Sequence, residues 1–489
     1  MKCITLVLLL FITASCLASV EHPQFRNRLD RAACGDSLYG DPNRTFPMFN
    51  FLAGDFVSRC GHPFLDNNPN QFCLSQPNPG FAAGIRLLSN SRDTAAWRPL
   101  YRLQSSLLIK PLTWLTVYHS FEVYSRDGAD NPWSADWGGL YAGNREAFLL
   151  LRQNRYLLLA GRFSPITGPH GESSLLFSSN QSLDGYHFEF NLPLWNGEFW
   201  FTAGHWQLDD LQVYGGFARR YLAGHRLGYT RANSFSLALA EMLLYGGINA
   251  VPTAATLNPL LLYHAMQMNG FEGNTLYHLS GWWRPRKGLL FTMEFLLDDL
   301  QLDSSQPSDQ EPAEWGMAVE ARITPPRQPL LLALGYTRIA QRTYNSQLPY
   351  QRCQQRGQPL AHPNGSDFDQ LSGRISFNGW PHLQPSLIAT YTRSGERDLF
   401  ADWDTPWLLV PEDHSFSEAF PTGVVEQKWS GTLRLNTQWR QGELILSATA
   451  LSWKNYQHTS NRQDDFRIDL EFNLFLEHFI SRGFTPRQS

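Results

Sequence analysis

The stretch "FRIDLEFNLFLEHF", residues 466–479, repeats with a period of two close to the end of the chain. One parity is apolar: Phe466, Ile468, Leu470, Phe472, Leu474 and Leu476. The other parity is polar apart from Phe475: Arg467, Asp469, Glu471, Asn473 and Glu477. Successive side chains of a β-strand point to opposite faces, so the stretch predicts a strand with one apolar and one charged face. The apolar face lies either in a soluble core or against lipid, in which case the charged face lines a wet interior.

A clear hairpin signal lies at residues 185–206, "GYHFEFNLPLWNGEFWFTAGHW". Apolar and polar residues alternate on both sides of Asn196-Gly197. This dipeptide favours the positive φ angles of a two-residue type I′ turn. The segment therefore predicts two antiparallel strands joined by a tight turn.

Similar tight junctions recur and alternate with longer polar or aromatic segments. The predicted tight turns lie at Lys110-Pro111, Gln153-Asn154, Asn196-Gly197, Ala232-Asn233, Pro285-Lys287, Pro326-Gln328, Pro381-Leu383 and Gln441-Gly442. The long segments lie near 91–97, 126–145, 164–184, 208–221, 246–274, 300–313, 341–368, 395–427 and 456–463. Alternation of short turns and long loops is typical of bacterial outer-membrane barrels. The spacing predicts an all-β, antiparallel transmembrane barrel of about 18 strands, within a range of about 16–20.

The length of the strands also favours a barrel in lipid over a soluble β-protein. They run to about 10–14 residues, which is enough to cross a membrane at a tilt of roughly 45°. Lipid tolerates no open sheet edge, so a closed barrel satisfies every backbone donor. The mean hydropathy of −0.32 is too polar for a bundle of membrane helices. A soluble sandwich or propeller is the alternative, but it needs no apolar outer face.

Composition excludes some classes of partner. The net charge of −4 gives no reason to expect nucleic acid or another polyanion. Basic residues are almost all arginine, 35 against 5 lysines. Arginine forms bidentate pairs with carboxylates and therefore suits a packed polar interior, although a GC-rich genome is an alternative explanation.

The N-terminus has the pattern of an exported protein. Residues 1–19, "MKCITLVLLLFITASCLAS", predict a signal peptide, because a basic start precedes an apolar run and small residues. Residues 20–80 alternate weakly and are interpreted as a periplasmic or plug-like segment. Residues 81–480 then form the barrel in the bacterial outer membrane, and 481–489 form a short tail.

Export permits disulfide bonds between the four cysteines that follow the signal peptide. Cys60 and Cys73 are the nearest pair and the first candidate, although the sequence cannot fix the connectivity. We expect no metal site, because no CxxC motif or histidine cluster accompanies these cysteines. No cofactor is expected either.

Three segments in order along the chain resemble a known family. The first is "LLLAGRFSPITGPHGESSLLFSSN" (157–180), the second is "RRYLAGHRLGYTRANSFSLALAEMLLYGG" (219–247), and the third is "NPLLLYHAMQMNGFEGNTLYHLSGWWRPRKGLLFTMEFLLDDLQ" (258–301). Together they cover about a third of the chain, and the ordered set resembles the Wzi-like capsule-assembly family of outer-membrane proteins. The resemblance implies an 18-stranded barrel with a lumen blocked by its own loops. It also implies a lectin-like, non-enzymatic role in holding capsular polysaccharide at the cell surface, with polysaccharide-export machinery as a further partner.

The resemblance also places four charged residues on strands or strand ends: Arg162, Arg226, Glu241 and Asp298. If they point inward, we expect a charged network in the lumen, since unpaired charges in such a space are costly. The alternative is that they only stabilise the barrel.

Two loops are candidates for binding sugar. Their candidate residues are Trp133, Asp136 and Trp137 in loop 126–145, and Asp402, Trp403, Asp404 and Trp407 in loop 395–427. Aromatic rings stack on the apolar faces of sugars, and carboxylates bind the hydroxyl groups. The alternatives are an ordinary acidic loop for the first and an inward-folded plug with packed rings for the second.

Loop 246–274 contains "LNPLLLYHAMQM". Asn258 and Pro259 suit the first turn of a helix. We expect a short helix here whose Leu261, Leu262, Tyr263 and Met266 pack against the barrel interior.

An enzyme is the least favoured class. No GxSxG, HExxH or P-loop motif is present. Ser173, Ser174, Ser178 and Ser179 near His170 and Asp184 are the only candidates for a hydrolase. A porin-like diffusion channel for sugars or small solutes is the main alternative to the polysaccharide-binding function.

Overall fold

A computed structural model describes residues 80–477 of the chain with several gaps. The gaps are 91–96, 113, 126–139, 154, 164–168, 171–172, 178–181, 232–233, 301–309, 327, 381–382, 412–415 and 440–441. The predicted signal peptide, nearly all of the N-terminal segment, the C-terminal tail and the candidate pair Cys60–Cys73 lie outside the described residues.

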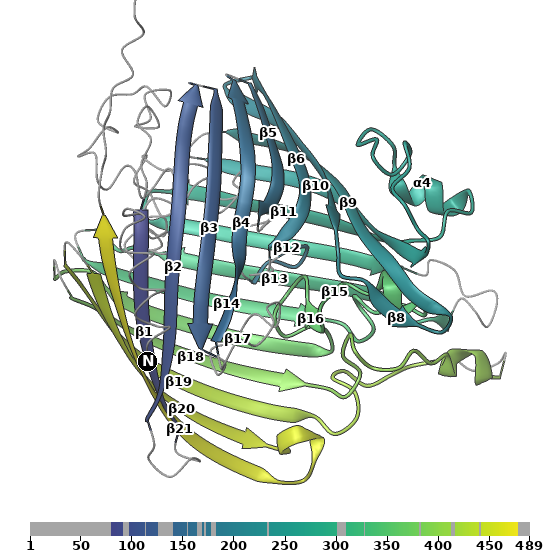
Figure 1. The fold of residues 1–489 in the computed structure, drawn as a ribbon. Helices are drawn as coiled ribbons and strands as arrows, with labels where there is room; N and C mark the ends of the chain where they lie inside the picture. The colour runs from purple at the N-terminus through teal and green to yellow at the C-terminus, as the bar shows by residue number, and fades with distance from the viewer. Residues whose placement is uncertain are drawn as a thin grey trace, which may run out of the picture.

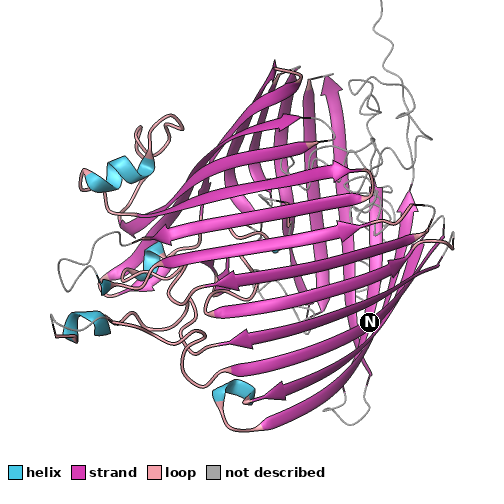
Figure 2. Ribbon diagram, turned by 180° about the vertical axis from the view of Figure 1, so that it is seen from behind, coloured by secondary structure: helices cyan, strands magenta, loops and turns pink. Residues whose placement is uncertain are grey.

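One antiparallel sheet of 19 strands forms the molecule (Figures 1 and 2). Its first half comprises β1 (Gly80–Asn90), β2 (Trp97–Leu112), β3 (Leu115–Ser125), β4 (Leu140–Gln153), β5 (Tyr156–Phe163), β6 (Leu183–Leu194), β7 (Gly197–Gln207), β8 (Leu211–Val213), β9 (Gly216–Arg231) and β10 (Phe235–Ile248). Its second half comprises β11 (Asn274–Arg286), β12 (Leu289–Asp299), β13 (Glu314–Ile323), β14 (Leu330–Ile339), β17 (Phe368–Phe377), β18 (Leu383–Ser394), β19 (Glu426–Trp439), β20 (Gly442–Lys454) and β21 (Arg462–Glu477). Without the three-residue β8, eighteen strands remain, as predicted.

The order of pairing follows the chain and brings its two ends together. Each long strand is antiparallel to the next one along the chain, from β2 and β3 to β20 and β21. The last strand then pairs with the first, so that Phe472 of β21 lies opposite Ile85 of β1. β1 and β2 lie side by side, but the described strands show no hydrogen-bonded register between them, so the ladder is not closed at this seam. The predicted barrel architecture is otherwise confirmed.

Eight pairs of consecutive long strands are joined by short connections at one end of the barrel, the turn end, at or next to the predicted tight turns. Trp195 and Asn196 both have positive φ, 47° and 60°, as the predicted type I′ turn requires. The first turn lies slightly later than predicted, because β2 continues to Leu112, which pairs with Leu115. The described long connections lie at the other end, which we call the loop end.

The outer wall is apolar, as β12 shows most clearly. Phe291, Met293 and Phe295 are 38–42 % exposed, whereas the intervening Thr292 and Glu294 are buried. A row of large apolar side chains facing outward along successive strands suits lipid rather than water. The exterior therefore supports the interpretation of the period of two as a membrane strand.

The C-terminal strand follows the same alternation. Phe466 and Phe472 are exposed on the outer face of β21, at 47 % and 39 %. On the opposite parity, Asn473 donates a hydrogen bond to Glu471, and Asp465 is buried. The apolar face of this stretch therefore looks out of the barrel and its polar face looks in.

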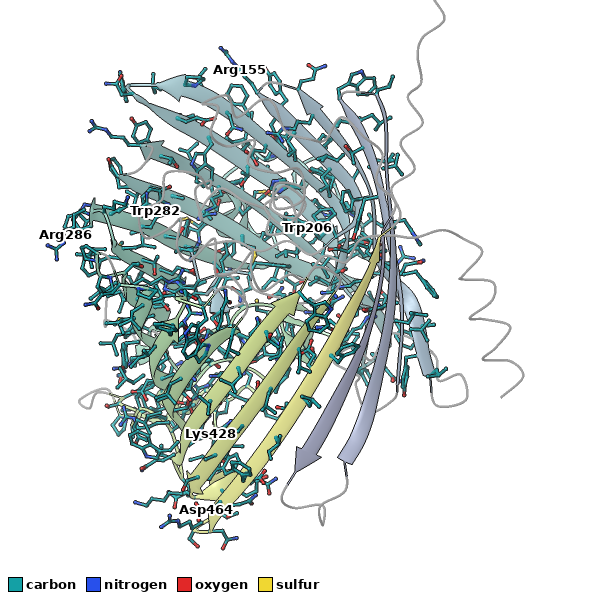
Figure 3. All side chains as sticks on the ribbon, turned by 90° about the vertical axis from the view of Figure 1, so that its left-hand side faces the viewer. Arg155, Trp206, Trp282, Arg286, Lys428 and Asp464 are labelled. Atoms are coloured by element: carbon teal, nitrogen blue, oxygen red, sulfur yellow. The ribbon has the colours of Figure 1, made fainter. Side chains whose placement is uncertain are left out.

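Aromatic side chains gather near the tight turns. Trp283 stacks on Phe291 beside one turn, with ring centroids 5.7 Å apart, and Trp439 stacks on Phe472 beside another. Trp195 is 81 % exposed within its turn. Aromatic belts of this kind mark the interface between lipid and water. Figure 3 places charged residues at the two rims, with Arg155 and Arg286 at the turn end and Lys428 and Asp464 at the loop end.

The short helix predicted in loop 246–274 is present, but its position differs from the prediction. It is α4 (Tyr263–Met268), and its N-cap residue is Leu262 rather than Asn258. It lies outside the wall beside β10 and β11, not in the lumen (Figures 1 and 2). The apolar "LLLY" run suits either location, so its sequence could not decide between them. Across the described part of the chain, no helix has the length and apolarity needed to span a membrane.

Leu433, in the middle of β19 and 49 % exposed, tests the lipid contact. Replacing it with Arg is expected to lower the free energy of unfolding in lipid vesicles by about 2–4 kcal/mol, because a charge would then face acyl chains. The control Leu433→Met keeps the surface apolar and should leave stability nearly unchanged. Equal denaturant midpoints for Leu433→Arg and the native protein would contradict a lipid-facing wall.

Candidate functional site

Three loop segments fill the loop end of the lumen and form what we call the plug (Figure 2). They follow β5, β14 and β18 and comprise the described residues of 169–177, 340–367 and 395–425, that is, without 171–172 and 412–415. Each contributes a fully buried leucine to the main core cluster: Leu175, Leu360 and Leu399. These side chains pack in the same cluster as wall residues such as Leu222 and Leu296. Loops therefore enter the lumen and pack against its inner wall, in the manner of the loop-plugged barrel that the family resemblance implied.

Glu294, on the inner face of β12, fixes the first plug segment to the wall. Its carboxylate accepts hydrogen bonds from the backbone N–H of Leu175 at 2.8 Å and from the hydroxyl of Ser174 at 2.8 Å. Ring nitrogens of His170 and His278 each lie 2.9 Å from it. A buried carboxylate needs such partners, because an isolated charge in this environment is costly. Glu294 thus anchors the loop.

Arg220, on the inner face of β9, fixes the second plug segment. The side chain is fully buried and donates to the carbonyl oxygens of Tyr350, Arg352 and Gln354 at 2.6–3.0 Å. It also pairs with Asp209 at 2.8 Å. The planar guanidinium satisfies four acceptors at once, which a lysine could not do with the same geometry.

Tyr344 links the second segment to the first. Its hydroxyl donates to the carbonyl of Leu175 at 2.6 Å, and its N–H donates to Asp298 of β12 at 2.6 Å. Burial raises the pKa of this phenol well above its usual value, so it stays protonated and keeps donating. The plug segments therefore hold each other as well as the wall.

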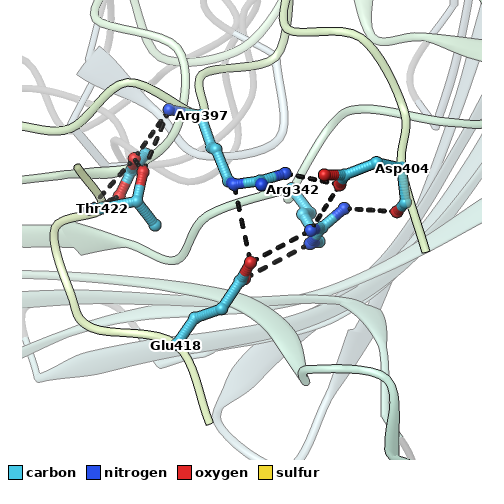
Figure 4. Close-up of polar contacts among 6 residues, drawn as sticks. Arg342, Arg397, Asp404, Glu418 and Thr422 are labelled. Atoms are coloured by element: carbon cyan, nitrogen blue, oxygen red, sulfur yellow. Dashed lines mark hydrogen bonds and ion pairs between the residues drawn. The ribbon is translucent and has the colours of Figure 1, made fainter. Parts of the chain in front are cut away.

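An ion-pair network ties the third segment to the second (Figure 4). Arg342 lies 2.7 Å from Asp404 and 3.1 Å from Glu418. Arg397 also pairs with Asp404 and lies 3.5 Å from Glu418. Hydrogen bonds from Arg397 and Arg342 lower the pKa of the Asp404 carboxyl, which keeps it charged. Asp367 adds a further link, because it accepts the N–H groups of Arg397 and Thr422 at 3.0 Å.

The candidate sugar-binding residues of loop 395–427 differ in accessibility. Trp407 is buried, with the guanidinium of Arg342 4.8 Å from its ring centroid, so its ring packs inside the plug. Trp403 meets Trp407 edge-on at 6.3 Å and is half-buried. Asp402 is exposed, whereas Asp404 is engaged in the ion pairs above. Trp133, Asp136 and Trp137 of the other candidate loop lie outside the described residues.

The four residues expected in one lumen network lie on two sides of the wall. Asp298 faces inward and holds Tyr344. Arg226 also faces inward, donates to Ser280 at 2.5 Å and lies over the ring of Trp200. The other two residues, Arg162 and Glu241, share the parity of outward-facing strand neighbours, Leu158 and Leu239.

These outward positions correct the expectation of one lumen network. Arg162 pairs with Asp184 of β6 at 2.6 Å, and both side chains are substantially exposed. Glu241 accepts the N–H groups of Tyr263 and His264 from the α4 loop at 2.9 Å and 2.7 Å. The resemblance located these residues on strands, but the period of two decides the face, and two of the four fall on the outer one.

The candidate hydrolase residues are not assembled. The hydroxyl of Ser174 donates to Glu294, and His170 contacts Glu294 and Thr292. Asp184 lies on the outer face beside Arg162. Ser178 and Ser179 lie outside the described residues. Ser174 and His170 therefore act as ligands of one buried carboxylate, in an arrangement unlike a nucleophile–base pair.

Cys353 is a buried free thiol within the plug, and burial raises its pKa. Within the described ranges, no three His, Cys, Asp or Glu side chains are arranged to hold a metal ion.

Sequence reasoning missed Glu294, Arg220 and Arg342, which hold the plug. The available signal was parity: Glu294 is an acidic residue on the inner face of a strand with outward Met293 and Phe295. An inward charge on a strand predicts a polar partner from elsewhere in the chain, because an unpaired charge in the lumen is costly.

No profile of a known protein family matches the chain, and no curated protein matches its sequence. Among solved structures, the chain is similar to Wzi, an outer-membrane protein involved in group 1 capsule assembly in Escherichia coli and described as a carbohydrate-binding β-barrel. The TM-score is 0.58 at 14 % identity, over 96 % of this chain and 100 % of that chain.

Two further solved structures are less similar to the chain, with TM-scores below 0.5. They are OccK10 (OpdN) of Pseudomonas aeruginosa, with a TM-score of 0.47 and 10 % identity over 82 % of this chain and 99 % of that one, and OccAB4 of Acinetobacter baumannii, with 0.46 and 12 % over 84 % and 100 %. At these identities the likeness concerns the fold. The chain thus has the outer-membrane barrel fold of Wzi, and the resemblance predicted from its sequence is confirmed at the level of the fold.

Proposed function

We propose that this protein is a non-enzymatic outer-membrane barrel that binds surface or capsular polysaccharide and assists its assembly or retention at the cell surface. The observation that carries the proposal is the plug, because loops held to the inner wall by buried charges occupy the loop end of the lumen. The loop surface is then the part of the molecule that meets the cell exterior. The Wzi structure supports this choice, since that protein is described as carbohydrate-binding and shares the fold.

Asp402 and Trp403 are the described residues best suited to bind sugar. Trp403 is half-buried and held against the plug, so its ring is positioned before a ligand arrives. Asp402, the neighbouring residue, is exposed. A fixed ring next to an exposed carboxylate fits a sugar, which presents an apolar face and a rim of hydroxyl groups. Trp133, Asp136 and Trp137 complete the proposed set, with polysaccharide-export machinery as a further partner.

A porin-like channel for sugars or small solutes is the second candidate function. The barrel fold is compatible with it, but the contacts of Glu294 and Arg220 argue against an open path. Opening the lumen would separate buried charges from their partners, at a cost of about 3–5 kcal/mol for each broken pair.

Trp403→Ala and Asp402→Asn test the polysaccharide site. Each is expected to weaken binding of purified cell-surface polysaccharide about tenfold, the equivalent of roughly 1.4 kcal/mol, because a stacking face or a hydroxyl acceptor is lost. Leu409→Ala is the matched control, since Leu409 is 86 % exposed in the same loop and has no polar group. Dissociation constants from calorimetry that stay unchanged in both variants would remove these residues from the proposal.

Planar-bilayer recording tests the closed lumen. The native protein is expected to give negligible conductance, and Glu294→Ala should produce open events, because the segment 169–177 then loses its main polar anchor. Arg162→Ala removes an ion pair on the outer wall and should stay closed. Steady large steps from the native protein would favour the porin function instead.

A further inference from the structure

Polar side chains occupy the outer face of the wall near the loop end, where lipid would otherwise lie. His205 of β7, Tyr221 and His225 of β9, and Glu241 and Tyr245 of β10 form this patch. The pairing of β9 with β10 places them side by side, with Tyr245 opposite Tyr221 and Glu241 opposite His225. Facing acyl chains directly, these groups would have no hydrogen-bonding solvent, at a cost of several kcal/mol each.

The loop that carries α4 covers this patch. Glu241 accepts two of its backbone N–H groups, from Tyr263 and His264. The hydroxyl of Tyr245 lies 2.8 Å from Nε2 of His205 and donates a hydrogen bond to the hydroxyl of Thr256 at 2.9 Å.

Further contacts fasten the rest of the loop. Tyr186 donates to the carbonyl of Leu257 at 3.1 Å, and Tyr221 donates to that of Ala250 at 3.4 Å. Tyr263 is only 1 % exposed and packs among Tyr221, Leu243 and Tyr245. The loop therefore supplies hydrogen-bond partners to Glu241, Tyr245 and Tyr221, whereas Nδ1 of His225 has no partner among the described residues.

The opposite face of the same loop is apolar and exposed. Leu260, Leu262 and Met268 are 80 %, 65 % and 78 % exposed, and Val251 is 55 % exposed. Residues 249–271 contain no Asp, Glu, Lys or Arg, although such residues make up 17 % of the chain. An ordinary loop in water would not keep this composition over an exposed surface.

The position of the loop along β10 matches the outer leaflet of the membrane. The turn end of β10 begins at Phe235, which contacts Tyr229 in the aromatic belt. Leu237 and Leu239, 48 % and 55 % exposed, follow on the lipid-facing surface. Tyr245 lies ten residues beyond Phe235, and a membrane strand needs about 9–11 residues. The covered stretch from Glu241 to Tyr245 therefore lies in the half of the bilayer nearer the loop end.

The geometry points to residues 249–271 as a lateral membrane anchor that inserts Leu260, Leu262 and Met268 among the acyl chains of the outer leaflet. Its inner face replaces lipid over the polar patch, and its outer face continues the apolar surface of Leu237 and Leu239. Continuity with that surface and the lack of charge select acyl chains as the occupant. This inference rests on the barrel fold and is independent of any polysaccharide binding.

Photo-crosslinking tests the anchor directly. The full-length protein carries p-benzoylphenylalanine in place of Leu260 or Leu262 and is reconstituted in vesicles of phosphatidylethanolamine and phosphatidylglycerol. Leu239, on the bare lipid-facing wall, is the positive control position. Leu409, which is equally apolar but lies on η6 (Pro406–Leu409) beyond the loop end, is the negative one (Figure 1).

Mass spectrometry of the irradiated protein is expected to find lipid adducts at Leu260, Leu262 and Leu239, and none at Leu409. Adducts only between two copies of the chain would assign the surface to self-association and overturn the anchor. No adduct at Leu260 and Leu262, with Leu239 labelled, would place the loop in water and overturn it as well. Heat-modifiable mobility on gels confirms that each variant is folded before irradiation.

Discussion

Backbone polar groups inside a bilayer must find their partners within the protein, and the architecture of this chain follows from that constraint. Eighteen long strands follow it by pairing in chain order and by bringing β21 against β1, with the seam between β1 and β2 as the one described boundary without a hydrogen-bonded register. Once the strands are paired, the odd or even position of a residue along its strand decides whether its side chain faces the lipid or the lumen. Outward residues such as Met293 and Leu433 are accordingly apolar, and inward ones such as Glu294 carry charge.

The plug extends the same reasoning to the lumen. Glu294 and Arg220 are fully buried charges on the wall, and each obtains most of its partners from loops. His278 of the neighbouring strand β11 is a further partner of Glu294. The loops are in turn joined through Tyr344 and through the ion pairs of Arg342. Removing any one segment would leave buried polar groups of the other segments without their hydrogen-bond or ion-pair partners. The three segments are therefore expected to be stable only together.

The sequence predicted the features that depend on local chemistry. Turn residues such as Asn196-Gly197 and the period of two gave the strand number and all eight tight turns. The partners of Glu294 could not be predicted, because Ser174 lies 120 positions away along the chain. The outward position of α4 was also missed. An apolar run such as Leu260–Leu262 suits a packed interior and a lipid surface equally well, and only the outward parity of Glu241 and Tyr245 decides between them.

The sites for sugar are the least constrained by sequence. Trp403 and Trp407 look equivalent along the chain, yet one is half-buried and the other is buried beside Arg342. Their difference arises from the ion-pair network beneath them, which joins residues more than sixty positions apart. Aromatic and acidic residues in a loop thus indicate the chemistry of a site. Contacts between residues far apart in the chain decide which of the aromatic rings stay accessible.

Flotation of the mature protein with lipid vesicles after removal of detergent tests the central claim most directly. A barrel with an apolar exterior is expected to rise with the vesicles through a density gradient and to stay with them after washing in alkaline carbonate. Protein that remained at the bottom of the gradient, monodisperse and folded in buffer alone, would contradict the lipid-facing wall and everything built on it.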